Sequence, residues 1–206
     1  MTNWSSAIDR DRQPGRYGAY SDDGDGGIIL AEIQAATQMQ FAAWPDTLDH
    51  MGAVAMATAG VAAVPAAGRV SRAGDVSLLR VEPLKWWLVS PAPLATPPLV
   101  ASGLASGVAS GVASSEVGAV LDISDARCWI TLTGPRAATL LAHSLPIDVR
   151  PTAFADDAVV SSAIHHVGVT LWRADDGFNL LVPRSYAASI WQLLFGLAQQ
   201  YGVEVR

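Results

Sequence analysis

The sequence predicts an α+β protein in which one unit, strand–strand–helix–strand–turn–strand, occurs twice. Short apolar runs alternate with turn residues along most of the chain, which indicates strands, and only a few segments have the spacing of an amphipathic helix. The two halves of the chain have the same order of elements, and they contain similar strand ends, KWWLVSP at 85–91 and GFNLLVPRS at 177–185. The strand–turn–strand signatures favour antiparallel or mixed sheets.

The first unit follows an N-terminal arm. Residues 1–26 are polar and rich in Gly and Asp, so we expect little regular structure there. The apolar runs 27–34 and 38–44 predict two strands, although the first could also begin a helix. Asp46 is placed to cap a helix over about 47–59, because Ser, Thr, Asn and Asp are favoured at that position.

A hairpin and an unusual repeat complete the first half. The apolar runs 76–81 and 86–90 flank a short turn that contains Pro, which is typical of a hairpin. LVASGLASGVASGVASSE, at 99–116, has the composition of a linker, whereas its four-residue spacing indicates a helix face. Each Gly inside a helix costs about 1 kcal/mol relative to Ala. We nevertheless predict a helix over about 98–114, because a long helix follows the matching strand in the second half.

The second half repeats this order. Gly134-Pro135 begins its first predicted helix, since Pro is favoured in a first helical turn. Ser185 can cap a final amphipathic helix that ends at Gly202. The expected strands are 117–124, 128–134, 158–173 (one strand or two) and 178–183. The predicted organisation is therefore an arm (1–26), a first α+β half (27–116) and a second α+β half (117–206).

The composition bears on partners. Of the 206 residues, 50% are hydrophobic and only 16% are charged, below the usual quarter. Either the core is large for the chain or other subunits cover part of the surface. The seven Trp are compatible with both alternatives, since Trp fills cores and is also enriched at interfaces. The net charge of −6 without a Lys/Arg cluster argues against nucleic acid as a partner, because binding to phosphates needs a basic surface.

The single cysteine and the apolar segments bear on location. Cys128 is the only cysteine, so the chain has neither an internal disulfide nor a cysteine-based metal site. The N-terminal residues contain no apolar run typical of a secretory signal. The Ala/Gly/Ser/Val-rich stretch 99–118 has too few large apolar residues to predict a membrane span. We therefore expect a cytoplasmic protein that does not bind membranes.

The pair His165-His166 is the most obvious candidate for chemistry. Adjacent side chains of an extended strand point to opposite faces, so the two imidazoles should not bind one metal ion together. Asp156-Asp157 and Asp175-Asp176 have the pattern of turn residues. The sequence contains no Gly-x-Ser-x-Gly motif and no phosphate-binding loop.

Residues 21–32, SDDGDGGIILAE, imitate a calcium-binding loop. Asp23, Asp25, Gly26, Ile28 and Glu32 fall at the expected positions of that loop. Ser21 stands where the first Asp ligand belongs, and the Pro and Gly residues of the preceding stretch disfavour an entering helix. We therefore predict no catalytic, cofactor-binding or metal-binding residues in this chain.

Several motifs together resemble the gamma subunits of heterotetrameric sarcosine oxidases. The resemblance is strong over 117–206, is looser over 76–90 (VEPLKWWLV) and is only an outline over the first 60 residues. The motifs are Asp122-Ile123-Ser124 with Arg127, Gly134-Pro135, Leu145-Pro146-Ile147-Asp148, Pro151, Phe154 and Leu181-Val182-Pro183-Arg184-Ser185.

The resemblance implies a fold similar to that of the folate-binding aminomethyltransferases. It also implies a place in a complex that oxidatively demethylates sarcosine or a related N-methyl amine and passes the one-carbon unit to tetrahydrofolate. FAD, FMN, NAD, tetrahydrofolate and zinc are then expected on other subunits, with none in this chain. The implied partners are the alpha and beta subunits, with the delta subunit as a further candidate.

Three hypotheses follow for the function. The first is a non-catalytic gamma subunit that stabilises the alpha and beta subunits of such a complex. The second is an autonomous folate-binding protein that transfers one-carbon units. The third is a scaffold unconnected with amine oxidation. The motif match favours the first, and the low charge and the Trp content agree with it.

Overall fold

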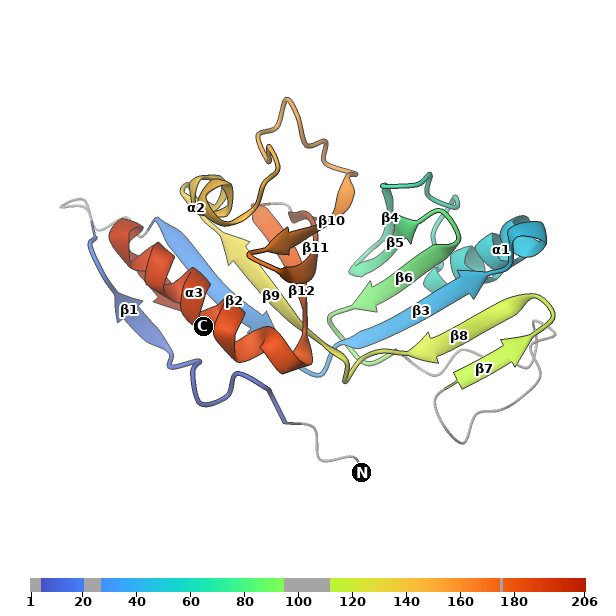
Figure 1. The fold of residues 1–206 in the computed structure, drawn as a ribbon, viewed down its shortest axis with the longest axis horizontal. Helices are drawn as coiled ribbons and strands as arrows, with labels where there is room; N and C mark the ends of the chain where they lie inside the picture. The colour runs from blue at the N-terminus through green and yellow to red at the C-terminus, as the bar shows by residue number, and fades with distance from the viewer. Residues whose placement is uncertain (1–4, 21–26, 95–111, 175) are drawn as a thin grey trace. The chain divides into compact units, whose positions relative to one another are not determined.

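The computed structural model describes residues 5–20, 27–94, 112–174 and 176–206, with the backbone alone at 112–115. The chain divides into two compact units. Unit 1 consists of the N-terminal segment up to Gln34 together with Ala126–Arg206, and unit 2 is Ala35–Asp125. Figure 1 shows the elements of both units.

Unit 1 is a seven-stranded sheet in the order β1-β13-β2-β9-β12-β11-β10. Among its described strands, β13–β2 is the only parallel pair. Helices α2 and α3 pack against β12, and apolar side chains of the helices and strands form one buried core. The elements are β1 (Gly15–Tyr17), β2 (Ile28–Ile33), β9 (Arg127–Thr133), α2 (Ala137–Ser144), β10 (Val159–Ile164), β11 (Val167–Ala174), β12 (Gly177–Pro183), α3 (Ala187–Ala198) and β13 (Val203–Val205).

Unit 2 is a six-stranded antiparallel sheet in the order β4-β5-β6-β3-β8-β7. Helix α1 packs against β3, β5 and β6, and a second buried core includes Phe41, Met51 and Trp86. The elements are β3 (Thr37–Ala43), α1 (Leu48–Ala59), β4 (Val70–Ala73), β5 (Val76–Glu82), β6 (Lys85–Ser90), β7 (Val112–Ser115) and β8 (Gly118–Asp122).

The two sheets repeat one strand order, with an exchange that the sequence does not reveal. The order β4-β5-β6-β3-β8 of unit 2 corresponds to β10-β11-β12-β9-β2 of unit 1. Strand β2 precedes β3 in the chain but pairs with β9, whereas β8 precedes β9 but pairs with β3. The compact units therefore differ from the predicted halves 27–116 and 117–206, because the first strand of each repeat lies in the sheet of the other repeat.

The predicted helix caps are wrong at both Asp46 and Ser185. Asp46 lies within a 3₁₀ turn, Pro45–Thr47, that precedes α1, and the N-cap residue is Thr47. A second 3₁₀ turn, Arg184–Tyr186, lies between β12 and α3 in the same way, and Tyr186 is the N-cap residue. Because of these turns, α1 begins at Leu48 and α3 at Ala187, and neither Asp46 nor Ser185 is at the N-cap position.

The N-terminal arm has more structure than predicted. Strand β1 pairs with β13, and Ile8 is fully buried in the core of unit 1. The Ser6 hydroxyl donates a hydrogen bond of 2.8 Å to the Glu32 carboxylate, and the Trp191 Nε1–H donates one of 3.2 Å to the Asp11 carbonyl. Residues 5–20 are therefore an integral part of unit 1.

The predicted helix over 98–114 falls mostly outside the described residues. Its last three residues, 112–114, belong to strand β7, which pairs with β8 in the register Val112↔Leu121. The predicted helical end is therefore wrong. Strands β4 and β13, which the sequence did not predict, lie at or near the edges of their sheets.

Candidate functional site

The connection from β9 to α2 is built by a glycine and a proline. Gly134 has a φ of +99°, which a residue with a side chain rarely adopts. A Cβ at this position would also lie 2.9 Å from the Gly27 carbonyl oxygen. The Arg136 N–H donates a hydrogen bond of 2.9 Å to that same oxygen. The turn therefore holds Arg136 beside the start of β2.

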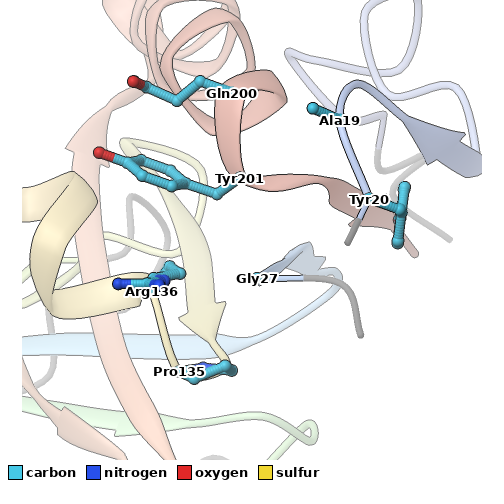
Figure 2. A pocket seen from close by; sticks show the side chains of 7 residues that line it. All are labelled: Ala19, Tyr20, Gly27, Pro135, Arg136, Gln200 and Tyr201. Atoms are coloured by element: carbon cyan, nitrogen blue, oxygen red, sulfur yellow. The ribbon is translucent and has the colours of Figure 1, made fainter. Parts of the chain in front are cut away.

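A cavity of about 620 Å³ opens beside this turn. Figure 2 shows Arg136 and Tyr201 on one side of it and Tyr20 on the other. We call it the Arg136 cavity; its described lining residues are Ala19, Tyr20, Gly27, Pro135, Arg136, Gln200 and Tyr201. They come from four separate segments of unit 1.

Several polar groups of the Arg136 cavity already have partners within the chain. The Tyr201 hydroxyl lies 3.1 Å from His143 Nε2, and Gln200 Nε2 donates to the Leu197 carbonyl at 2.9 Å. The Arg16 guanidinium lies over the Tyr20 ring at 4.5 Å. The described lining contains no carboxylate or thiol that could work as an acid, base or nucleophile. The cavity offers a guanidinium and phenols, which suit recognition of a polar group.

A second, more apolar hollow of about 580 Å³ lies along α2. We call it the α2 groove. One wall consists of Ala138, Thr139 and Ala142 of α2, and the other is the segment 145–150 that follows the helix. Leu145 and Val149 are only 4% and 2% exposed, which anchors this segment in the core of unit 1.

Arg173 of β11 fixes the segment that follows the groove. Its Nε–H and Nη2–H donate hydrogen bonds of 2.8 Å to the carbonyls of Phe154 and Val149, respectively. The guanidinium also lies over the Phe178 ring at 5.1 Å. This role of Arg173 is not visible in the sequence, since a backbone carbonyl acceptor leaves no side-chain pattern to detect.

The only charged side chains of the described groove lining are Asp148 and Arg150. Arg150 Nη2 and Nε donate to the Asp148 carboxylate at 2.6 and 2.9 Å, which is a bidentate ion pair. The hydrogen bonds from the Arg150 side chain and backbone lower the pKa of Asp148 to about 2. The pair therefore stays ionised and neutralises itself at neutral pH.

The structure places both candidate histidines in a turn. His165 and His166 connect β10 to β11, are exposed, and His165 has a φ of +53°. The two imidazoles therefore do not lie on opposite faces of an extended strand, as was expected from the sequence. The part of the chain that the structure describes contains no group of three or more His, Cys, Asp or Glu that could hold a metal ion.

The calcium-like stretch is described only from Gly27 onward, and residues 21–26 lie outside the described ranges. Glu32 lies in β2, is almost fully buried, and accepts hydrogen bonds from Ser6 and Gln34. Its carboxylate is also 3.6 Å from Arg12 Nε. Glu32 therefore attaches the N-terminal arm to the sheet.

Cys128 and the motif residue Asp122 also have local roles. Cys128 is buried, and this burial raises the pKa of its thiol. Asp122 accepts a hydrogen bond of 2.9 Å from the Ser124 backbone N–H, as in a turn. A raised thiol pKa disfavours the reactive thiolate, so Cys128 resembles a structural cysteine.

A comparison with known protein families identifies the family of this chain. Residues 45–199 match the model of the sarcosine oxidase gamma subunit family. This chain belongs to the sarcosine oxidase gamma subunit family. The gamma subunit from Arthrobacter sp. is 30% identical over 161 residues, which is 78% of this chain and 74% of that one. The gamma subunit from Corynebacterium sp. (strain U-96) is 32% identical over 165 residues, 79% and 74% of the two chains.

Solved structures agree with the family membership. A chain of the heterotetrameric sarcosine oxidase from Corynebacterium sp. U-96, in complex with pyrrole 2-carboxylate, is similar in structure. The match covers 90% of this chain and 88% of that chain. The TM-score is 0.71 and the identity is 26%. Aminomethyltransferase T of the glycine cleavage system from Bartonella henselae has a TM-score of 0.57 at 18% identity, over 87% of this chain and 47% of its own. The second match shows the fold alone.

These findings confirm the resemblance, the α+β fold class and the similarity to aminomethyltransferases. The match begins at residue 45, much earlier than the strongest sequence motifs. The chain thus belongs to a family of gamma subunits, and a chain of similar fold occurs in a heterotetrameric sarcosine oxidase. None of the described helices has the length and apolar character needed to cross a membrane.

Proposed function

We propose that this gamma subunit acts in assembly and contributes no catalytic, cofactor-binding or metal-binding residue of its own. The observation that carries the proposal is the family match over residues 45–199, together with the local roles of the reactive side chains. Glu32 ties the arm to β2, Cys128 is buried, and the two histidines lie in an exposed turn. The chain offers surfaces to the alpha and beta subunits, which it stabilises.

The reaction of the complex is the second part of this proposal. The complex oxidatively demethylates sarcosine or a related N-methyl amino acid and passes the one-carbon unit to tetrahydrofolate. FAD, FMN, NAD, tetrahydrofolate and zinc belong to the other subunits, and the complex is cytoplasmic. The relatives named as gamma subunits of sarcosine oxidase support this assignment.

Co-expression with the other subunits tests the assembly role. The chain should elute with them in size-exclusion chromatography, and the fraction should show the visible absorbance of flavin. A complex that assembles, keeps its flavin and remains stable without this chain would contradict the proposal.

An autonomous folate-binding transferase is the second candidate. The supporting observation is the aminomethyltransferase from Bacillus licheniformis, which is 33% identical over 89 residues, 41% of this chain and 24% of that one. Calorimetry of the isolated chain with tetrahydrofolate distinguishes the two candidates. Micromolar binding favours the transferase, and the assembly role predicts no measurable heat of binding.

A further inference from the structure

The α2 groove is an apolar surface with no uncompensated charge. Its walls carry Ala138, Ala142 and Ile147, and of these Ala142 is exposed. Its only described charged groups, Asp148 and Arg150, bind each other through two short hydrogen bonds. Apolar grooves on a protein surface commonly receive apolar segments of partner proteins.

The groove is also formed before any partner arrives. Leu145 continues from α2 through a hydrogen bond of 2.8 Å from its N–H to the Leu141 carbonyl. At the other end of this wall, Arg173 binds the Val149 carbonyl at 2.8 Å. A wall that is fixed at both ends loses little conformational entropy on binding, which favours association.

The charges indicate the chemistry of the occupant. A charged segment in the groove would lose its hydration and find no free counter-ion, because Asp148 and Arg150 neutralise each other. The exposed positions of α2 are Thr139, Ala142 and His143, which include no Lys, Arg, Asp or Glu. An uncharged apolar segment is therefore the occupant that fits the apolar walls, the Asp148–Arg150 pair and the exposed positions of α2.

We propose that the α2 groove receives an uncharged, apolar segment of a larger subunit of the sarcosine oxidase complex. The proposal rests on the assembly role given above and deepens it by naming the contact surface. A larger subunit is the expected occupant because the chain belongs to a gamma subunit family and matches a chain of a heterotetramer.

Cysteine labelling tests whether the groove is covered. Cys128 is the only cysteine and is buried, so the A142C variant carries one accessible thiol. A maleimide dye should label A142C quickly in the isolated chain. In the complex formed by co-expression, labelling should be at least about tenfold slower, since the thiol is then reached only through local opening. An equal labelling rate in the intact complex would overturn the proposal.

A photo-crosslinker on the A142C thiol identifies the occupant. The expected adduct joins this chain to a larger subunit. The cross-linked peptide of that subunit should carry no charged side chain at the site of attachment. An adduct with a second copy of this chain, or with a charged peptide, would overturn the proposed occupant.

A charge substitution gives an independent measurement. A142E should reduce co-purification with the larger subunits by at least about tenfold, because a buried, unpaired carboxylate is strongly unfavourable. A57E is the matched control, since Ala57 is also an exposed alanine of a helix, α1 in unit 2. It should co-purify like the wild type, and circular dichroism checks that both variants are folded. Equal retention of A142E and A57E, or equal loss, would contradict a specific role for the groove.

The wild-type chain separates this proposal from the assembly role. If the wild type itself fails to join the complex, the assembly role is wrong. If the wild type and A142C both join it and the thiol reacts freely, only the groove proposal is wrong.

Discussion

Units 1 and 2 share a strand framework and differ in what surrounds it. The order β10-β11-β12-β9-β2 of unit 1 corresponds to β4-β5-β6-β3-β8 of unit 2, and in each a helix follows the central strand. Unit 1 continues from β12 into α3 and β13. In unit 2, the chain after β6 passes through residues 95–111, outside the described ranges, before it reaches β7. The framework defines the fold, while both the Arg136 cavity and the α2 groove belong to unit 1.

A tryptophan–amide hydrogen bond occurs in both units with the strands interchanged, and it is buried in unit 1 and part-buried in unit 2. In unit 1, Trp129 of β9 donates its Nε1–H to Asn179 of β12 at 2.8 Å. In unit 2, Trp87 of β6 donates to Gln40 of β3 at 3.1 Å. The Trp donor thus lies on β9 in unit 1, whereas in unit 2 it lies on β6, which corresponds to β12 and not to β9. The correspondence of strands does not extend to individual side chains.

Removal of a large core side chain from either unit should have the largest effect on the free energy of unfolding. Trp191 of unit 1 and Trp86 of unit 2 are almost completely buried, so W191A and W86A should each lower the free energy of unfolding by about 3–5 kcal/mol. Because β2 and β8 are exchanged between the repeats, both variants should shift one shared calorimetric transition. Two transitions, each sensitive to only one variant, would show that the units unfold independently.

Loss of the amide acceptors should have intermediate effects and distinguish the units. N179A leaves the buried Trp129 N–H without this acceptor, which should cost about 1–3 kcal/mol. Q40A should cost less, about 0.5–1 kcal/mol, because Gln40 is only half-buried and its bond is longer. Urea unfolding measures both, and a larger loss for Q40A would contradict this ranking.

The smallest expected effect is on the pH dependence of stability, through the Asp148–Arg150 ion pair of the α2 groove. The pKa of Asp148 is lowered to about 2 in the folded chain, compared with about 3.9 for an ordinary Asp. The pair therefore stabilises the fold above about pH 4, and this contribution disappears as the pH falls from about 4 to about 2. In D148N, stability in this interval should decrease less steeply than in the wild type. Since the pair is exposed, the difference should be small, and identical acid-unfolding profiles would show that the pair contributes nothing.

Local patterns were sufficient to predict most strands but not the partners of those strands. The alternating burial of β2, from Ile28 to Ile33, is compatible with either sheet, so its pairing with β9 could not be predicted. Strand β13 has three residues, too few for a periodic pattern. Both helix caps were wrong because a 3₁₀ turn precedes each helix, and no residue pattern distinguished that turn from the first helical turn.

The sites were harder to predict than the fold. The Arg136 cavity combines residues 19–20, 27, 135–136 and 200–201, and only tertiary structure brings them together. The Gly134-Pro135 turn was the one local signal beside it. The α2 groove includes the predicted Leu145-Pro146-Ile147-Asp148 motif, but its shape depends on the contact of Arg173 with a backbone carbonyl.

Turnover per assembled complex tests most directly whether this chain acts through its surfaces. The double variant H165A/H166A and the variant C128S alter the side chains best suited to catalysis, and both should join the complex with the other subunits. We expect sarcosine-dependent turnover per complex within about twofold of the wild type, because the loss of a general acid or base costs about 10²–10⁴-fold and these side chains have no such role. A hundredfold loss of turnover in a fully assembled complex would contradict it.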